Sequence, residues 1–263
     1  FKQKTAYEIR LSLVGSEMCI RDRDGYPLIL TARHIKQLNT LADSLKKKYG
    51  VDVQVVPADL SVPGSAKSIF DFTEVAGLRV GVLVNDAGSG YYGNFSMISW
   101  EKQRETIMVN AMATTELTKL FLPNMLKDKR GGIMNLASIA AYLPGPNLAV
   151  YHATKAYILS LSLALAEELA PFGIQVTAIC PGATKTSFQS RAHMQRTRAF
   201  QQLGPMQAST VAKKAYAAFK RGDRVEIIGA HNKLLIEFER LLPQLAVTKI
   251  AKVMLKKVPR KTR

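Results

Sequence analysis

Tyr151 and Lys155 are the residues of this sequence whose types and spacing most directly permit acid–base chemistry. They open residues 151–170, an apolar segment that Pro171 and Gly173 close, and this pattern predicts a helix. Side chains four residues apart on a helix share one face. A tyrosine hydroxyl has a pKa of about 10, and a neighbouring ammonium lowers that pKa by stabilising the phenolate. Such a tyrosine can exchange a proton with a carbonyl or alcohol oxygen during hydride transfer.

Ser138 is a third candidate for the same site. It follows residues 132–137, a short apolar run that predicts a buried strand, and its hydroxyl can hold the oxygen that exchanges the proton. Tyr and Lys fall four residues apart by chance in many helices. The spacing therefore indicates a catalytic pair only through the elements and residues around it.

Those elements alternate along the chain from residue 26 onward. Short apolar runs predict strands at residues 26–32, 51–57, 80–84, 132–137, 174–180 and 225–228. Helical periodicity predicts helices at residues 34–49, 65–75, 101–126, 151–170 and 211–221. Apolar strands separated by helices imply a parallel sheet covered on both faces. The predicted fold class is therefore α/β, with a doubly wound parallel sheet.

Polar and small residues gather where these strands end. They are Arg33, Asp59, residues 85–88, Ser138 and residues 181–186. Ligands of doubly wound sheets bind beyond the carboxyl ends of the strands. This coincidence favours an enzyme or a cofactor-binding protein.

Composition narrows the class of protein. The 263 residues are 47% hydrophobic and 22% charged, which suits one large globular domain. No apolar run is long enough to span a bilayer, and the first residues lack a secretory signal pattern. Cys19 and Cys180 show neither metal-ligand nor redox spacing. We therefore expect a cytoplasmic protein without a disulfide framework or a metal site.

The formal net charge of +17 is partly local to the C-terminus. Nine basic and two acidic residues lie from Lys233 onward, with apolar residues between them. One interpretation is a basic amphipathic tail that contacts an anionic membrane surface or an acidic partner. The other, which we favour, is a helix packed on the domain with a solvated basic face. No recognised nucleic-acid-binding module is present, so nucleic acid is not expected as a partner.

The motifs taken together resemble one family in order and spacing. They are Asn85-Asp86-Ala87-Gly88 after a strand, Asn110 within a helix, Ser138, Tyr151-x-x-x-Lys155 and Pro181-Gly182-x-x-x-Thr186. This set resembles the short-chain dehydrogenase/reductase family from about Gly25 to Ile228. The sequences of the segments that contain these motifs are most similar to a bacterial branch of the family, which is related to hydroxysteroid dehydrogenases and long-chain ketoacyl reductases. The resemblance implies a Rossmann-like fold and an NAD(P)-dependent oxidoreductase acting on CH–OH groups.

The resemblance also implies catalytic roles. Tyr151 would be the general acid and base, and Lys155 would lower its pKa and bind the nicotinamide ribose. Ser138 would orient the substrate oxygen. Asn110 would bind a water molecule that links Lys155 to solvent, which completes a proton relay.

Cofactor contacts are implied in the same way. Asn85, Ala87 and Gly88 would line the adenosine side, and Asp59 with Leu60 would contact the adenine. Thr184 and Thr186, beside Pro181 and Gly182, would hold the carboxamide and diphosphate region. Asp86 stands where the family usually has Asn. Each of these residues could instead be a turn or cap residue.

Arg33 bears on the choice of cofactor. It follows a predicted strand at the position where an acidic residue would bind the ribose hydroxyls of NAD. Arginine presents a planar fork to a phosphate. We therefore expect NADP rather than NAD, although Arg33 could also be a surface residue at a helix start.

The N-terminal segment departs from the family. The family opens with a strand, a Gly-rich TGxxxGxG turn and a helix, whereas only Gly15 and Gly25 precede Tyr26. We expect the first strand and first helix to be lacking and interpret residues 1–23 as a non-family segment, with the hypothesis that it is a sequencing artefact. Residues 24–230 would form the Rossmann-like domain, and residues 231–263 a basic amphipathic helical extension.

Two functions of different classes remain open. The first is an NADP(H)-dependent reductase of a hydrophobic ketone or ketoacyl substrate. Residues 187–206 would form a mobile lid over that substrate or, alternatively, a surface helix. The second is a non-catalytic, truncated family member that acts as a binding protein, which the missing Gly-rich turn favours. The resemblance also implies a homodimer or homotetramer that pairs through residues 101–126 and 151–170. Weak membrane-surface contact through the tail is a further alternative.

Overall fold

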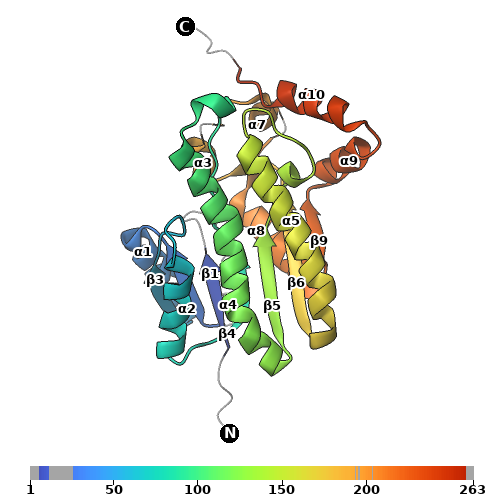
Figure 1. Ribbon diagram of the computed structural model, residues 1–263. Helices are drawn as coiled ribbons and strands as arrows, with labels where there is room; N and C mark the ends of the chain where they lie inside the picture. The colour runs from blue at the N-terminus through green and yellow to red at the C-terminus, as the bar shows by residue number, and fades with distance from the viewer. Residues whose placement is uncertain (1–5, 12–25, 193, 195, 203, 259–263) are drawn as a thin grey trace.

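Seven parallel strands form the central sheet of the computed structural model, which describes residues 6–11, 26–192, 194, 196–202 and 204–258. The strand order is β3-β2-β1-β4-β5-β6-β9 (Figure 1). The strands are β1 (Ala6–Leu11), β2 (Leu28–Ala32), β3 (Val53–Pro57), β4 (Arg79–Asn85), β5 (Gly131–Leu136), β6 (Ile174–Pro181) and β9 (Val225–Ile228). The order reverses between β1 and β4, and this switch point is where such sheets bind ligands.

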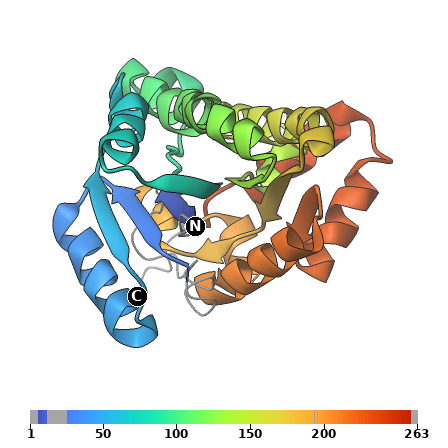
Figure 2. The same cartoon turned by 90° about the horizontal axis from the view of Figure 1, so that it is seen from below.

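Helices cover both faces of the sheet (Figure 2). One layer contains α1 (Ile35–Tyr49) and α8 (Ala208–Arg221). The other contains α2 (Ser65–Val75), α4 (Ala113–Asp128) and α5 (Ala149–Leu169). The largest hydrophobic cluster lies under the second layer, where the buried Phe121 of α4 packs with sheet residues such as Ile29 and Leu83. Val84, next in sequence to Leu83, packs with α8 on the opposite face, as the twofold alternation of strands requires.

The element boundaries match the predicted ranges to within a few residues. α1 ends at Gly50, which adopts the left-handed conformation (φ 67°) and closes the helix from its backbone N–H to the Lys46 carbonyl. Glycine adopts this conformation without the steric cost that a Cβ atom adds. The α/β, doubly wound prediction is therefore confirmed.

The expectation that the first strand is lacking is wrong. β1 pairs in parallel with both neighbours, so that Ile9 lies opposite Ile29 of β2 and Leu83 of β4. Without β1, the facing backbone groups of β2 and β4 would be unpaired in the middle of the sheet. The expected absence of the first helix concerns residues 12–25, which lie outside the described residues.

The predicted helix at residues 101–126 is interrupted. It consists of α3 (Trp100–Ile107), a π-helical segment (Met108–Met112) and α4. π-Helical turns widen the helix by one residue and occur frequently at functional sites. Asn110 lies at the centre of this segment.

The C-terminal extension forms two helices, α9 (Ala230–Glu239) and α10 (Gln244–Met254). They lie over the same end of the molecule as the short helix α7 (Arg198–Gln202) (Figure 1). β7 (Thr184–Lys185) and β8 (Met206–Gln207) form a separate small sheet that brackets α7 and the short helix α6 (Ser187–Arg191). The extension is therefore packed on the domain at the end where the strands finish.

Candidate active site

Ser138, Tyr151 and Lys155 line one cavity of ≈ 330 Å³ at the carboxyl edge of the sheet. Ser138 follows β5, and Tyr151 and Lys155 lie one turn apart on α5. Three of the four predicted catalytic residues therefore share a cavity. Asn110 is fully buried behind them.

Lys155 is buried, and its Nζ donates a hydrogen bond of 2.6 Å to the Leu136 carbonyl. Burial lowers the pKa of Lys155 to about 8, while the nearby Asp86 carboxylate opposes that shift. The ammonium also lies 5.9 Å from the centre of the Tyr151 ring. The pKa of Lys155 is therefore much closer to neutral pH than the pKa of a solvated lysine.

Tyr151 is half-buried, and burial raises its pKa to about 12, although a hydrogen bond with Ser138 opposes the rise. We expected Lys155 to lower the pKa of Tyr151, but in the structure this pKa is raised. The Lys155 ammonium is held by the Leu136 carbonyl and approaches the ring of Tyr151. Desolvation of the phenolate is therefore the larger effect.

Ser138 is held by backbone on two sides. Its Oγ accepts a hydrogen bond of 3.1 Å from the Ala140 N–H and donates one of 3.4 Å to the Pro181 carbonyl. The first contact caps the turn after β5, and the second joins it to the end of β6. The hydroxyl is thereby positioned beside Tyr151.

Asn110 connects two segments behind the cavity. Its Oδ1 accepts from the Ser89 N–H at 2.8 Å, and its Nδ2 donates to the Ser89 carbonyl and to Thr154 Oγ1, each at 2.9 Å. A Cβ atom on Gly88 would lie 3.7 Å from Asn110 Oδ1 and 3.8 Å from Lys155 Nζ. Asn110 thus anchors the loop after β4 to α5 with both of its N–H groups.

The predicted cofactor residues divide into two groups. Gly88, Tyr151, Lys155, Pro181, Gly182, Thr184 and Thr186 line the cavity. The cavity lining does not include Arg33, Asp59, Leu60, Asn85 and Ala87, which follow or end β2, β3 and β4. The structure therefore brings the first group together with the catalytic candidates and sets the second beside them along the sheet edge.

Several residues of the two groups already have protein partners. Asp59 Oδ1 accepts hydrogen bonds from the N–H and hydroxyl of Ser61, so it closes a turn. Thr184 donates to the Gly182 carbonyl at 3.0 Å, and Thr186 donates to Gln189 Oε1 at 2.9 Å. Arg33 forms a long contact of 3.4 Å with Glu105. An exposed pair of this kind contributes about 0–1 kcal/mol, so Arg33 can be drawn to a phosphate.

Two orphaned polar atoms support a polar ligand at the switch point. Thr31 Oγ1 and Asn85 Oδ1 are buried and have no hydrogen-bond partner among the described residues. Both residues lie opposite Leu11, the last residue of β1. Buried acceptors and hydroxyls rarely remain unpaired, so the residues here fit a polar nucleotide cofactor.

Close packing positions the Tyr151 ring, and the sequence did not predict part of this packing. The ring lies 5.3 Å from that of Phe188, a residue of the predicted lid. A Cβ atom on Gly90 would lie 2.8 Å from Tyr151 Cδ2. Only glycine fits there, but nothing in the spacing of Gly90 distinguishes it from a turn residue.

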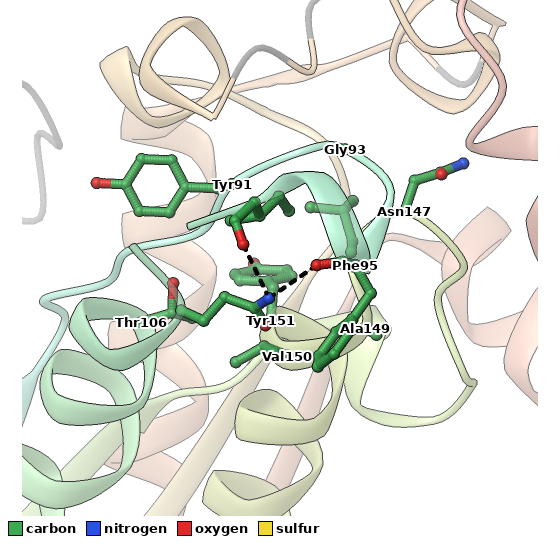
Figure 3. A pocket seen from close by; sticks show the side chains of 11 residues that line it. Tyr91, Gly93, Phe95, Thr106, Asn147, Ala149, Val150 and Tyr151 are labelled. Carbon is green, nitrogen blue, oxygen red and sulfur yellow. Dashed lines mark hydrogen bonds between the residues drawn. The ribbon is translucent and has the colours of Figure 1, made fainter. Parts of the chain in front are cut away.

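A smaller cavity of ≈ 30 Å³ lies on another side of Tyr151 (Figure 3). Tyr91, Phe95 and Thr106 contribute to its lining, and Gln103 Nε2 holds the wall by donating to the Phe95 carbonyl at 3.1 Å. The space suffices for a water molecule. Tyr151 is therefore reached from two cavities.

α9 and α10 contribute one wall of the larger cavity. Leu235 and Glu239 come from α9, and Ile250, Ala251 and Met254 come from α10, with Leu255 directly after it. The sequence predicted this extension as a segment separate from the site. The apolar face of α9 and α10 is the sequence feature that could have indicated a place at the cavity. The sequence does not show, however, which part of the domain this face covers.

Comparison with known proteins identifies the family. Residues 14–197 match the family model described as short chain dehydrogenase. The chain therefore belongs to the short chain dehydrogenase family, as its motifs predicted.

Curated relatives and solved structures agree with this assignment. Very-long-chain 3-oxoacyl-CoA reductase of Aspergillus terreus is 33% identical over 171 residues, which are 63% of this chain and 48% of the relative. The mouse protein of the same name is 31% identical over 161 residues, 60% of this chain and 51% of the relative. The chain thus spans about half the length of these relatives.

Two solved structures cover nearly the whole chain. A short-chain dehydrogenase from Sphingobium yanoikuyae in complex with NADPH is 28% identical, with a TM-score of 0.78 over 92% of this chain and 97% of that one. The bulky-bulky ketone specific alcohol dehydrogenase from Comamonas testosteroni is 26% identical, with a TM-score of 0.74 over 91% and 93%. A nicotinamide cofactor is therefore bound by a protein of the same fold.

Proposed function

We propose that this protein transfers a hydride between NADP(H) and a carbonyl or alcohol carbon, and that it reduces a hydrophobic ketone or ketoacyl substrate. The observation that carries the proposal is the placement of Ser138, Tyr151 and Lys155 on one cavity at the carboxyl edge of the sheet. Acid, hydrogen-bond donor and ammonium are the groups that carbonyl reduction needs beside its cofactor.

Ser138, Tyr151 and Lys155 have different roles in the protonation of the substrate oxygen. When bound, the nicotinamide supplies the hydride that adds to the carbonyl carbon. The Ser138 hydroxyl donates a hydrogen bond to the carbonyl oxygen, and the Tyr151 hydroxyl donates its proton to the same oxygen as the alcohol forms. Lys155, with its pKa lowered to about 8, then passes a proton to the tyrosinate that remains.

The cavity walls favour a hydrophobic substrate. Leu143, Phe188, Leu235, Met254 and Leu255 lie among the lining residues. Relatives of the chain are named for long-chain 3-oxoacyl substrates, and a structural neighbour is named for bulky ketones. These names support a ketone or 3-ketoacyl group on a large apolar body.

The preference for NADP rests on Arg33. It directly follows β2, where no acidic side chain is present in the sequence to bind ribose hydroxyls. Its guanidinium is 41% exposed and only weakly held by Glu105, so it is available to a 2′-phosphate. A neighbouring structure bound to NADPH supports the same choice.

Deuterium transfer tests the proposal. The protein is incubated with a panel of hydrophobic ketones and NADPH deuterated on the transferred position, and the product alcohol is analysed by mass spectrometry. We expect deuterium on the carbinol carbon for at least one bulky ketone. NADPH binding without labelled alcohol from any ketone would support the competing proposal, a non-catalytic binding protein, which the missing Gly-rich turn favours.

Exposed apolar residues on α9, in the turn after it and at the start of α10 support contact with a membrane surface. Leu234, Phe238, Leu241 and Leu245 are 58–81% exposed, and basic residues such as Lys233 lie among them. Apolar side chains next to lysines bind the interface of anionic bilayers. None of the helices in the described part of the chain combines the length and apolar character needed to cross a bilayer. We propose a cytoplasmic protein whose α9–α10 pair touches the membrane.

Vesicle co-sedimentation tests the membrane contact. Truncation after Leu242 is unsuitable because α10 lines the cavity, so we choose the double substitution Leu241→Glu with Leu245→Glu. We expect phosphatidylserine vesicles to sediment the unaltered protein several-fold more than the variant, and phosphatidylcholine vesicles to sediment neither. Equal sedimentation of both proteins would rule this surface out.

The α4–α5 layer supports a homodimer or homotetramer. Met112, Tyr157 and Leu163 are 41–53% exposed on or beside these helices. Helices with exposed apolar residues form isologous contacts readily. Light scattering after size-exclusion chromatography tests this proposal, and a monomer at micromolar concentration would contradict it.

A further inference from the structure

Glu239 is a carboxylate that the proposed chemistry does not use. It is the last residue of α9 and lines the large cavity among apolar side chains. Its Oε2 is buried and has no hydrogen-bond partner among the described residues. Burial raises the pKa of this carboxyl group. One oxygen of the Glu239 carboxylate is therefore buried in the wall of the large cavity without a hydrogen-bond partner among the described residues.

Neighbouring charges do not compensate Glu239. Arg240, the next residue, contacts Glu237 at 3.0 Å and lies 5.9 Å from the Tyr142 ring. Glu239 also ends its helix, where the helix dipole disfavours negative charge. A buried polar group without a partner destabilises a fold. A glutamate at this position does not stabilise the fold. A ligand that completes the hydrogen bonds of its carboxylate would explain why a glutamate is present.

The position of Glu239 separates it from the reacting atoms. Ser138 and Tyr151 approach the cavity from β5 and α5, whereas Glu239 belongs to the wall formed by α9 and α10. A substrate whose carbonyl reaches Tyr151 therefore presents another part of its body to Glu239. The strongly basic chain disfavours a cation as that part, and a hydroxyl group donates a hydrogen bond without bringing charge.

Resting on the proposed function, we infer that Glu239 is a specificity-determining residue that accepts a hydrogen bond from a hydroxyl on the apolar body of the substrate, away from the carbonyl. The substrate class is then a hydroxylated hydrophobic ketone. A site built to hydrogen-bond a substrate hydroxyl rejects the analogue that lacks it, because the protein group then stays unpaired.

A matched pair of ketones tests this inference. The pair shares one hydrophobic skeleton, with and without a hydroxyl group remote from the carbonyl, and kcat/KM is measured for both. We expect the unaltered protein to prefer the hydroxyketone by about 10- to 100-fold. Glu239→Leu should abolish or reverse this ratio, and Glu239→Gln should keep part of it, since an amide oxygen still accepts. Glu237→Leu, two residues away and exposed, is the matched control and should keep the ratio.

Measurements of equilibrium binding and of the melting temperature test the role of Glu239 without depending on turnover. Calorimetric titration with the same two ketones should show the same preference and its loss in Glu239→Leu. This variant should also melt about 2–4 °C higher, because it removes a buried carboxylate oxygen that has no hydrogen-bond partner among the described residues. Equal ratios for Glu239→Leu and the unaltered protein would overturn the inference while leaving the proposed reductase intact. Absent turnover with an intact binding preference would contradict only the reductase.

Discussion

Tyr151 and Lys155 respond to the same burial in opposite directions. Desolvation disfavours the charged form of each group, so it raises the pKa of the phenol to about 12 and lowers that of the ammonium to about 8. The tyrosine is thereby kept protonated, as a proton donor in ketone reduction must be. The lysine is brought near neutrality, which suits a group that restores the donated proton.

Tyr151→Phe tests the proton donor. The substitution keeps the ring that packs on Phe188 and removes only the hydroxyl. We expect kcat for ketone reduction to fall about 10²- to 10⁴-fold while NADPH binding, followed by fluorescence, is retained. Tyr157→Phe on the same helix, whose hydroxyl bonds to Thr115, is the control and should keep kcat. A Tyr151→Phe variant with full activity would remove Tyr151 from the mechanism.

Lys155 should leave a signature in the pH dependence of stability. Its pKa is about 8 in the folded chain and about 10.5 when solvated, so between these values the unfolded chain binds more protons. Stability contributed by this residue therefore rises with pH in that window. Urea unfolding at about pH 7.5 and 9.5 should show a gain of roughly 2 kcal/mol that Lys155→Met lacks. Parallel pH profiles for the two proteins would contradict the lowered pKa.

At this scale the sequence predicted the identities of the catalytic candidates and missed their environment. Spacing placed Tyr151 and Lys155 on one helical face, the end of a predicted strand added Ser138, and the family motif added Asn110. The direction of the tyrosine pKa was wrong, because desolvation depends on atoms contributed by distant segments. Gly90 was missed for the same reason, since its close approach to Tyr151 exists only in the folded chain.

The π-helical segment between α3 and α4 explains why Asn110 reaches both Ser89 and Thr154. Periodicity predicted one continuous helix there, because a single inserted residue barely changes an apolar pattern. The widened turn places a fully buried amide between the loop after β4 and α5. The segment thus connects the element that carries Tyr151 to the loop that borders Lys155.

Asn110→Ala tests this element. The change leaves the Ser89 N–H and carbonyl without their partner, so we expect the free energy of unfolding to fall by about 1–3 kcal/mol. Activity should fall as well, since the loop and α5 lose their link. The control is Asn124→Ala on the exposed side of α4, where only a 3.2 Å contact with Glu74 is lost. An Asn110→Ala loss no greater than that of the control, in chemical unfolding, would contradict the account.

The position of α9 and α10 at the cavity is a second feature that the sequence pattern did not predict. Their amphipathic character was visible, and packing on the domain was the favoured interpretation. The sequence did not reveal that the inward face would complete the substrate cavity, because amphipathicity defines a buried face but not what it covers. The extension that follows the last strand of the sheet therefore lines the cavity in which we propose that the substrate binds.

Across the whole molecule, the parallel sheet brings together the ends of strands that lie far apart in the sequence. Alternation of apolar runs and helices predicted this architecture from residue 26 onward. β1 was missed because Ala6–Leu11 lies in a segment without the family motif, and its pairing depends on the open position between β2 and β4. Thr31 and Asn85, each with a polar atom that has no partner in the described part of the chain, flank the end of that strand.

β1 pairs in the middle of the sheet, which counts against a non-family origin of all of residues 1–23. We propose that a restored Gly-rich turn strengthens cofactor binding. The turn would supply several backbone N–H groups to the diphosphate, each a charge-assisted hydrogen bond. We expect a chain with a TGxxxGxG turn after its first strand to bind NADPH at least 10-fold more tightly in calorimetric titration. Sequencing of the genomic locus checks the origin of the segment, and a reading frame that encodes residues 1–23 would refute the artefact hypothesis.

The most direct test of the account is NADPH consumption by the chain with the restored turn. Absorbance of NADPH is followed with a bulky hydrophobic ketone, for the protein with and without Tyr151→Phe. The account predicts ketone-dependent oxidation that the single substitution reduces by at least 10²-fold while NADPH remains bound. Ketone-dependent oxidation that is unchanged in Tyr151→Phe, or NADPH binding without oxidation by any ketone, would contradict it.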